Sequence, residues 1–211
     1  MNFKRLPYRT QWIEPTEIDR VMRSLNAPPT ARHPDGRALY TLPVINDQVN
    51  GRVVSNASTI AEYLEAVYPA RPLIPDGCCS LQTLFVHYLH VEFSRPLLPV
   101  MITHRSQAQF YPGLPPIEPC PPGPHREQAW RKIRENFDFL SSILDKNKSD
   151  VGGDGDLTTG RELTYADLTL CSILIWIERV SPQEGWSRIR TWNGGRWTRL
   201  MERCREYMDL L

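Results

Sequence analysis

The fold is decided by residues 40–64, which read Tyr40-Thr-Leu-Pro-Val-Ile45, a polar turn from Asn46 to Gly51, Arg52-Val-Val-Ser55 and Asn56-Ala-Ser-Thr-Ile-Ala-Glu-Tyr-Leu64. Two short β-branched runs on either side of an Asn/Asp/Gly segment are typical of a β-hairpin. Apolar side chains then recur at helical spacing, and the polar residues before them can cap a helix. This stretch therefore predicts a strand, a turn, a second strand and a helix, in that order.

Pro43 stands in the middle of the first predicted strand, where a proline has no N–H for the ladder. A cis Leu42–Pro43 bond would turn the N–H and C=O of Leu42 outward, so that they could pair with an extended, peptide-like ligand. The helix that starts after Ser55 would offer free N–H groups nearby, which favour a carboxylate. A peptide clamp beside an anion site describes a glutathione pocket. The alternative that these residues leave open is an edge-strand proline beside an ordinary capped helix.

Composition excludes several classes of protein. The chain has 211 residues, 41% of them hydrophobic, which is enough for one large domain or two small ones. Its formal net charge of +1 argues against nucleic acid or an anionic membrane as a partner. The first residues lack the apolar core of a signal peptide, and the longest apolar run, residues 168–177, is too short to span a bilayer. Five cysteines, an odd number, fit reduced thiols, so we expect a cytoplasmic protein.

Shorter patterns precede the hairpin. Alternation at residues 8–13 predicts a strand, and residues 16–25 predict a short helix. Residues 27–37 are mostly turn formers, so we expect a surface loop there. That loop would deliver His33 and Arg37 next to the strand that carries the proline.

A proline-rich linker follows at residues 69–77, and the pattern beyond it is helical. We predict two domains, an α/β domain at residues 1–70 and an all-α domain at residues 80–211. The second is predicted to contain, in order, a helix over residues 80–102 that Pro96 and Pro99 bend or end, a helix with an apolar stripe from Trp130 to Leu144, a core helix with a capping box of Thr164 and Asp167, and a last helix from Gly195.

Seven prolines in residues 111–124 exclude a helix or a central strand from that segment. A loop of this length in a compact domain is often a lid. It could border a pocket and carry Phe110 or Tyr111 over it; an excursion over the surface is the alternative.

Short motifs are spread along nearly the whole chain: Thr41-Leu-Pro-Val-Ile45, Ile60-Ala-Glu-Tyr-Leu64, Tyr68-Pro69, Leu73-Ile-Pro75 and Thr164-Tyr-Ala-Asp-Leu168. In this order they resemble a soluble glutathione transferase. Three more segments are similar to fungal, etherase-related members of that superfamily: Asn2-Phe-Lys-Arg-Leu-Pro-Tyr-Arg-Thr10, Pro28-Pro-Thr30 and Trp192-Asn-Gly-Gly-Arg-Trp197. Each motif is weak alone, but the series is specific.

The resemblance implies a thioredoxin-like N-terminal domain with a cis proline, followed by an all-helical C-terminal domain. It also implies a homodimer, glutathione as cosubstrate and an apolar second pocket between the domains. Carried over by position, Leu42 would hold the cysteinyl backbone of glutathione and Pro43 would be the cis proline. From the fold of the family we expect Tyr88, Val91, Arg95 and Trp176 to line the second pocket, although core packing is the simpler role for Trp176.

Two positions depart from the family pattern. Family members carry an acidic residue and a serine at the two positions where this chain has Asn56 and Ala57. In the family these two side chains meet the γ-glutamyl end of glutathione. Asn56 can accept a hydrogen bond without charge assistance, and Ala57 keeps its N–H but lacks the hydroxyl. Ser55 or Ser58 could substitute, so we expect glutathione affinity to be reduced and not abolished.

A second departure concerns the beginning of the chain. Family members start with a strand and a helix, which carry the Tyr, Ser or Cys that stabilises the glutathione thiolate, before the segment matched by residues 2–10. We therefore expect a truncated thioredoxin-like domain, or a repositioned strand at Tyr8. No residue inherits the catalytic role by position, and Arg9, His33 and Arg37 are the polar candidates near the expected site.

Three kinds of activity fit these features. The first is an enzyme in which glutathione thiolate adds to a hydrophobic electrophile, either as conjugation or as cis/trans isomerisation of a conjugated olefin. Such enzymes serve detoxification and, in fungi, biosynthesis of polyketide-type metabolites. The alternative is a catalytically silent relative that binds apolar metabolites, and a regulatory relative that uses the fold for protein contacts is the third possibility.

Overall fold

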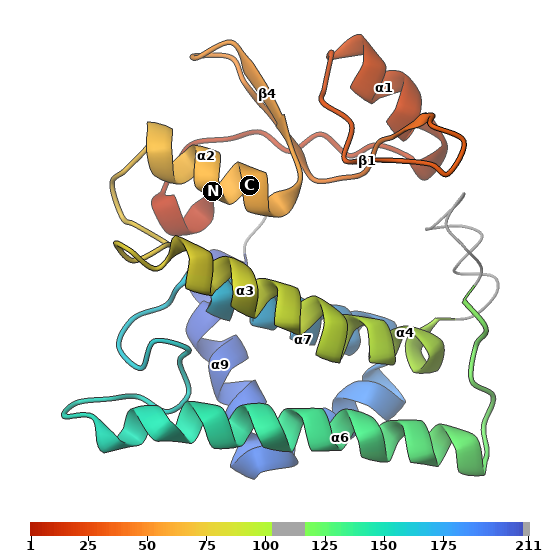
Figure 1. The fold of residues 1–211 in the computed structure, drawn as a ribbon, viewed down its shortest axis with the longest axis vertical. Helices are drawn as coiled ribbons and strands as arrows, with labels where there is room; N and C mark the ends of the chain where they lie inside the picture. The colour runs from red at the N-terminus through yellow and green to blue at the C-terminus, as the bar shows by residue number, and fades with distance from the viewer. Residues whose placement is uncertain (103–116, 209–211) are drawn as a thin grey trace. The chain divides into compact units, whose positions relative to one another are not determined.

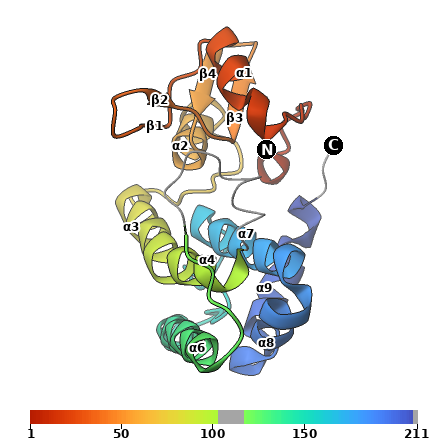
Figure 2. The ribbon, with the colours of Figure 1, turned by 90° about the vertical axis from the view of Figure 1, so that its right-hand side faces the viewer.

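The structure is a computed structural model that describes residues 1–102 and 117–208. The chain divides into two compact units, Met1–Leu73 and Ile74–Asp209. The first unit combines short strands with helices, and the second is helical (Figures 1 and 2). Within the described residues, no helix is long and apolar enough to cross a membrane.

The first unit is built around the predicted hairpin and helix. Strands β3 (Val44–Asp47) and β4 (Arg52–Ser55) pair antiparallel, with Val44 opposite Ser55, and α2 (Ala57–Val67) follows at once. Val54, Ile60 and Leu64 form the small buried cluster that joins the hairpin to the helix. The remaining elements are a 3₁₀ turn at Asn2–Lys4, a second one at Pro15–Glu17, α1 (Ile18–Ser24) and a second antiparallel pair of strands, β1 (Ala31–Arg32) and β2 (Ala38–Leu39).

Three expectations for this unit need correction. Residues 8–13 form no strand, because no described strand lies alongside to pair with them, and Trp12 is 78% exposed. Residues 27–37 are not wholly loop, since β1 lies within them and pairs with β2. Pro43 precedes β3 and does not lie inside it, as expected for a residue that has no N–H to give to the ladder.

The buried side chain of Lys4 connects the N-terminal turn of the first unit to the end of α2 and the segment after it. Its side chain is 3% exposed, and its ammonium lies 2.7 Å from Glu65 Oε1 and donates to the Tyr68 carbonyl at 2.8 Å. The same ammonium lies 3.4 Å from the carbonyl oxygens of Ala70 and Arg71. A buried charge is tolerated only when it is paired and hydrogen-bonded, so Lys4 ties the N-terminal turn to the segment after α2.

The second unit packs long helices around one core. Its elements are α3 (Cys79–Leu89), a π turn (His90–Ser94), α4 (Arg95–Met101), α6 (Pro124–Leu144), a 3₁₀ turn (Asp145–Ser149), α7 (Tyr165–Val180), a second π turn (Pro182–Trp186), α8 (Ser187–Ile189), a 3₁₀ segment (Trp192–Gly195), α9 (Arg196–Cys204) and a last 3₁₀ turn (Arg205–Tyr207). The predicted apolar stripe of α6 is fully buried: Trp130, Ile133, Phe137, Leu140 and Leu144.

The helix predicted over residues 80–102 is present as one continuous run that contains a π turn. The π turn at His90–Ser94 joins α3 to α4, so the run reaches Met101 (Figure 1). Pro96 lies in the first turn of α4, directly after the π turn, and Pro99 lies two residues before the end of α4. Because the run is continuous, each proline removes one backbone hydrogen bond from it. The Pro99 carbonyl accepts the Cys120 N–H at 2.7 Å, which satisfies one acceptor at the helix end.

The predicted capping box is confirmed at the start of α7. Asp167 Oδ2 accepts the Thr164 N–H at 2.9 Å and the Thr164 hydroxyl at 2.8 Å. Thr158 donates to the same carboxylate through its N–H and its hydroxyl, at 2.8 and 2.9 Å. Thr164 and Asp167 are both fully buried, so these bonds satisfy polar groups that burial would otherwise make costly.

Candidate functional site

The Leu42–Pro43 peptide bond is cis, as the family resemblance implies. Leu42 is 44% exposed, and within the described part of the chain its N–H and C=O have no hydrogen-bond partner. The residue before it is anchored, because Thr41 donates to Thr30 Oγ1 through its N–H at 3.2 Å and its hydroxyl at 2.9 Å. The peptide groups of Leu42 are therefore held in place and open to a ligand.

The register of the hairpin brings the start of α2 to the same place. Val44 pairs with Ser55, so continuing each strand by two residues puts Leu42 and Ala57 at one end of the β3–β4 hairpin. Ala57 is exposed, and among the described residues its N–H has no partner. An extended peptide with a carboxylate at one end fits this pair of open groups.

Asn56 caps α2 with its own side chain. Its Oδ1 accepts the Ser58 N–H at 2.9 Å and lies 3.5 Å from the Thr59 nitrogen, while its carbonyl accepts the Ile60 N–H at 2.8 Å. The backbone of Asn56 has a φ of 76°, which Asn tolerates better than most residues. The expected free N–H groups of Ser58 and Thr59 are thus occupied, and the Ala57 N–H remains.

The two serines that could replace the missing hydroxyl lie in different surroundings. Ser55 is 6% exposed, and its buried Oγ has no partner among the described residues. It therefore does not reach a ligand at the surface. Ser58 is half-buried in the first turn of α2.

His33 and Arg37 lie at the turn of the β1–β2 hairpin, whereas Leu42 follows the open end of that hairpin. Arg37 is exposed and pairs with Asp35, with 2.7 Å between Nε and Oδ2. The His33 N–H donates to the Arg37 carbonyl at 2.8 Å. The hairpin of β1 and β2 projects away from α2 in Figure 2. The contacts of His33 and Arg37 given above are therefore local to the turn of that hairpin.

The expected second-pocket residues divide between core and surface. Tyr88 contacts Phe93 edge-on, with ring centroids 5.8 Å apart, and burial raises the pKa of its phenol. Tyr88 and Trp176 both pack against the helical core, which is the simpler role anticipated for Trp176. Val91 is half-buried in the π turn, and Arg95 is exposed. Phe110 and Tyr111 lie outside the described residues.

A cavity of about 600 Å³ lies elsewhere in the second unit. It is lined by the end of α4, the start of α6, the segment before α6 and the second π turn. None of the expected pocket residues contributes to it: its lining includes Met101, Cys120, Arg126, Ser181 and Glu184.

Comparison with known proteins agrees with these features. A family model described as "Glutathione S-transferase, C-terminal domain" matches residues 104–207. A glutathione S-transferase of Ceriporiopsis subvermispora, solved in complex with glutathione, is 31% identical, with a TM-score of 0.85 over 100% of this chain and 88% of that one. The chain belongs to the glutathione transferase family.

Two further relatives are fungal. Glutathione transferase GSTFuA3 of Phanerochaete chrysosporium is 30% identical, with a TM-score of 0.83 over 100% of this chain and 87% of that one. The Glutathione S-transferase-like protein ustS of Aspergillus flavus is 24% identical over 99% of this chain and 81% of its own length. The fold is therefore the predicted one, a thioredoxin-like N-terminal part followed by a helical C-terminal part.

The cap of α2 confirms a sequence prediction, because Asn56 is one of the two polar residues, with Ser58, that were expected to cap this helix. Asn is among the preferred N-cap residues, and the helix begins directly after it.

Proposed function

We propose that this protein is a glutathione-dependent transferase that acts on hydrophobic, electrophilic small molecules. The observation that carries the proposal is the meeting of the open Leu42 peptide groups with the exposed Ala57 N–H at one end of the β3–β4 hairpin. Family membership supplies the ligand, because a relative of 31% identity was solved with glutathione bound.

Glutathione is the cosubstrate in this proposal. Its cysteinyl N–H and C=O pair with Leu42, as an added strand pairs with a sheet edge, beside Pro43. Its γ-glutamyl carboxylate lies at the start of α2, where it accepts the Ala57 N–H and meets the positive end of the helix. Ser58 borders this subsite, and Asn56 lies directly before it. His33 and Arg37 are then outer groups that steer an anionic peptide.

The chemistry begins with the glutathione thiolate. In conjugation its sulfur forms a bond to an electrophilic carbon, and the displaced electron pair leaves with the departing group or takes up a proton. In isomerisation the thiolate adds to a conjugated olefin, the former double bond rotates, and elimination returns glutathione. Both reactions suit detoxification or fungal specialised metabolism.

In this proposal the helical unit binds the hydrophobic substrate. We assign glutathione binding to residues 1–70 and substrate binding to residues 80–211, with Tyr88, Val91, Arg95 and Trp176 contacting a hydrophobic substrate. A homodimer in the cytoplasm completes the proposal. Exposed apolar side chains on α3 and α6 support a partner copy: Leu81, Leu84, Phe139 and Ile143.

A silent binding protein is the second candidate. The Asn56-Ala57 pair supports it, because both residues weaken the contacts that the family makes with the γ-glutamyl end. The two candidates differ in turnover and not in binding of apolar molecules.

Calorimetric titration of glutathione into the whole chain tests the proposal. We expect a dissociation constant in the millimolar range or tighter. Ala57→Pro is the matched variant, because proline is favoured at the first helical position and removes only the N–H that meets the carboxylate. It should weaken binding about tenfold, the effect of one hydrogen bond to a charged group. Absence of binding to a folded wild-type protein would reject the proposal.

Turnover assays then separate the two candidates. A panel of aryl halides, epoxides and conjugated olefins is incubated with glutathione, and products are resolved by mass and by geometry. Conjugate formation or olefin isomerisation that is faster than the uncatalysed reaction supports the transferase. Binding of glutathione and apolar probes without turnover of the panel supports the silent binder.

A further inference from the structure

The cavity in the helical unit has the size of a small-molecule site. Its volume of about 600 Å³ falls within the usual range for such sites, about 300–1,000 Å³. Protein interiors are close-packed and rarely contain voids larger than a water molecule, so a space this large needs an explanation. The residues that we propose for glutathione and for the substrate do not line it. The cavity therefore requires an occupant of its own.

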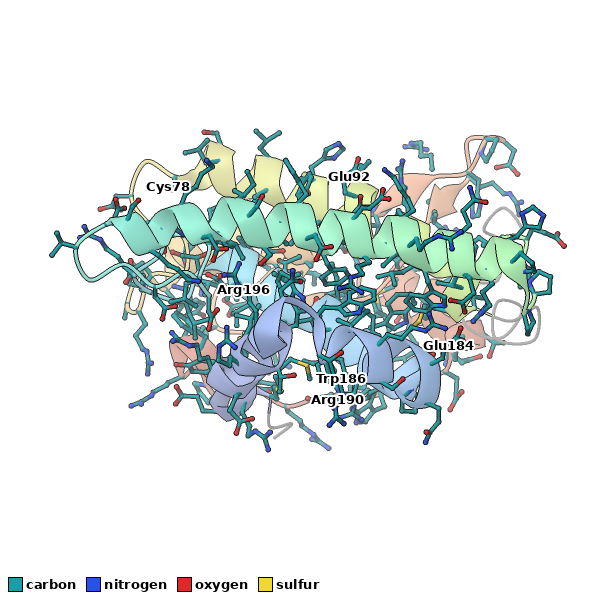
Figure 3. All side chains as sticks on the ribbon, turned by 90° about the horizontal axis from the view of Figure 1, so that it is seen from below. Cys78, Glu92, Glu184, Trp186, Arg190 and Arg196 are labelled. Atoms are coloured by element: carbon teal, nitrogen blue, oxygen red, sulfur yellow. The ribbon has the colours of Figure 1, made fainter. Side chains whose placement is uncertain are left out.

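The side chain of Arg126 holds three walls of this cavity in place. Its guanidinium donates to the Cys120 carbonyl, in the segment before α6, and to the Val100 carbonyl, near the end of α4. It also makes two bonds to Glu184 in the second π turn, which lies beside the first half of α6 in Figure 3. Because one side chain ties all three segments to α6, the walls resist collapse. A preformed site of this kind loses little conformational entropy when a ligand enters.

The charged and hydroxyl groups of the lining are engaged by the protein itself. Arg126 pairs with Glu184, and the Glu127 carboxylate accepts two bonds from Arg188, at 2.7 and 2.9 Å. The Ser181 hydroxyl oxygen accepts a backbone N–H of the π turn at 3.0 Å. A charged ligand would have to compete with these bonds, and breaking a partly buried ion pair is costly. The cavity is therefore suited to a molecule without charge.

The rest of the lining is apolar and includes two side chains that contain sulfur. The apolar residues are Val100, Met101, Ile102, Pro119, Pro121 and Pro122. The Met101 thioether can pack favourably against the edge of an aromatic ring, and the free thiol of Cys120 behaves as a small hydrophobe. The Cys120 sulfur makes only a long contact of 4.0 Å with the Pro121 carbonyl. These walls suit an aromatic ring better than a polar or flexible chain.

From the size of the cavity, its fixed walls, its paired charges and its sulfur atoms, we infer that it binds a neutral aromatic molecule. The site is additional to those for glutathione and for the substrate, and the inference does not depend on the proposed function. Binding at this site should not require glutathione.

The first test uses prodan, a neutral naphthalene fluorophore whose emission shifts to shorter wavelength in apolar surroundings. We expect prodan to bind the whole chain saturably. Cys120→Phe places a ring in the cavity and leaves the backbone bonds of that residue intact, so it should weaken binding about tenfold or more. Cys79→Phe, at an exposed position in α3, is the matched control and should bind prodan as the wild type does. Equal affinities in the two variants would overturn the inference.

A second test locates the probe without a bulky substitution. Cys171 and Cys204 are buried, so replacing Cys78 and Cys79 by serine leaves Cys120 as the accessible thiol of the chain. Saturating prodan should slow alkylation of Cys120 by iodoacetamide about tenfold, as mass spectrometry measures it. An unchanged rate would contradict the inference. Naphthalenesulfonate, a charged counterpart of the probe, should not protect the thiol; equal protection by it would contradict the requirement for a neutral ligand.

Glutathione titration separates this inference from the proposed function. Wild type and Cys120→Phe should bind glutathione equally, because Cys120 lies in the helical unit and lines only the cavity. Absence of glutathione binding to both, with prodan still protecting Cys120, would reject the proposed function and leave the aromatic site standing. Circular dichroism and thermal unfolding check that each variant is folded.

Discussion

Arg126 and Glu184 form a two-bond ion pair, with 2.8 Å between Nε and Oε1 and 2.7 Å between Nη2 and Oε2. The same carboxylate accepts the Trp130 indole N–H at 2.8 Å. The hydrogen bond from Arg126 holds the pKa of Glu184 below its ordinary value. These contacts join the first turns of α6 to the second π turn, and Figure 3 shows Glu184 beside that half of α6.

Replacing Arg126 by methionine should therefore destabilise the helical unit. The variant leaves Glu184 without its charged donor, and the arginine side chain is 16% exposed, so we expect a loss of about 2 kcal/mol in the free energy of unfolding. Urea unfolding followed by tryptophan fluorescence measures it. Arg131→Met, on the exposed face of the same helix, is the control and should change stability by less than about 0.5 kcal/mol. Equal losses in the two variants would show that the ion pair of Arg126 with Glu184 does not stabilise the helical unit.

Lys4→Met tests the buried ammonium in the first unit. The methionine fills the stem of the lysine but leaves the Glu65 carboxylate, 18% exposed, without its charge partner. We expect a loss of about 2–4 kcal/mol, since removing one member of a buried pair is costly. Hydrogen exchange of the amides in residues 65–73 should also accelerate.

The control for that change is Arg5→Met, one residue further on at an exposed position. It should leave both stability and exchange nearly unchanged. If Lys4→Met were equally harmless, the ammonium would contribute nothing to the first unit.

The carboxyl group of Asp156 should make the unfolding free energy of the helical unit depend on pH. Hydrogen bonds from Arg199, 2.6 and 2.9 Å long, lower the pKa of this carboxyl from its ordinary value of 3.8, against the opposing effect of burial. A lowered pKa in the folded state means that the stabilisation is present above about pH 4 and is lost as the pH falls through the folded value.

Asp156→Asn should therefore flatten the fall in unfolding free energy as the pH drops below about 4, where the wild type loses this contribution. Urea titrations at several pH values measure the slope. Arg199→Met, which removes the main cause of the shift, should flatten the same part of the curve. An unchanged slope in both variants would exclude Asp156 as a source of the acid sensitivity.

Thr164→Ala tests the cap of the core helix. The change removes a buried hydroxyl that donates to Asp167 and leaves that carboxylate with fewer donors. We expect a loss of about 1–2 kcal/mol, the usual effect of deleting an N-cap side chain. Thr169→Ala, a hydroxyl in the same helix that bonds only to the Tyr165 carbonyl, is the control and should cost less.

Local signals predicted the parts of the fold that depend on neighbouring residues. The β3–β4 hairpin, α2 and the capping box at Thr164 follow from turn, cap and periodicity rules that act over a few residues. The stripe of α6 is equally local, because one face of the helix meets the core. These elements were placed to within a few residues.

Features that depend on distant partners could not be predicted in this way. Residues 8–13 have the alternation of a strand, but alternation does not supply a neighbouring strand. The two-residue pairing of β1 with β2 is too short to leave a pattern. Residues 80–102 read as one helix that Pro96 and Pro99 bend or end, and periodicity does not reveal that a π turn carries the chain through.

At the site, too, local signals were informative and the positions of distant residues were not. Leu42 and Pro43 were singled out because a proline inside a predicted strand is a visible anomaly. The cap made by Asn56 also follows from a local preference for Asn at this position, and the structure confirms it. His33 and Arg37 were expected near the site because they are close to Leu42 in sequence, and that expectation stays a prediction.

The π turn at His90–Ser94 also determines where this chain can change length. A π turn bonds each N–H to the carbonyl five residues back, so it holds one residue more than the α-helical turn it replaces. Deleting one residue there would restore a regular helix and keep both α3 and α4 in their present orientations. The same deletion within α3 would rotate every later side chain by about 100° about the helix axis. Gaps between this chain and its relatives should therefore fall at this turn.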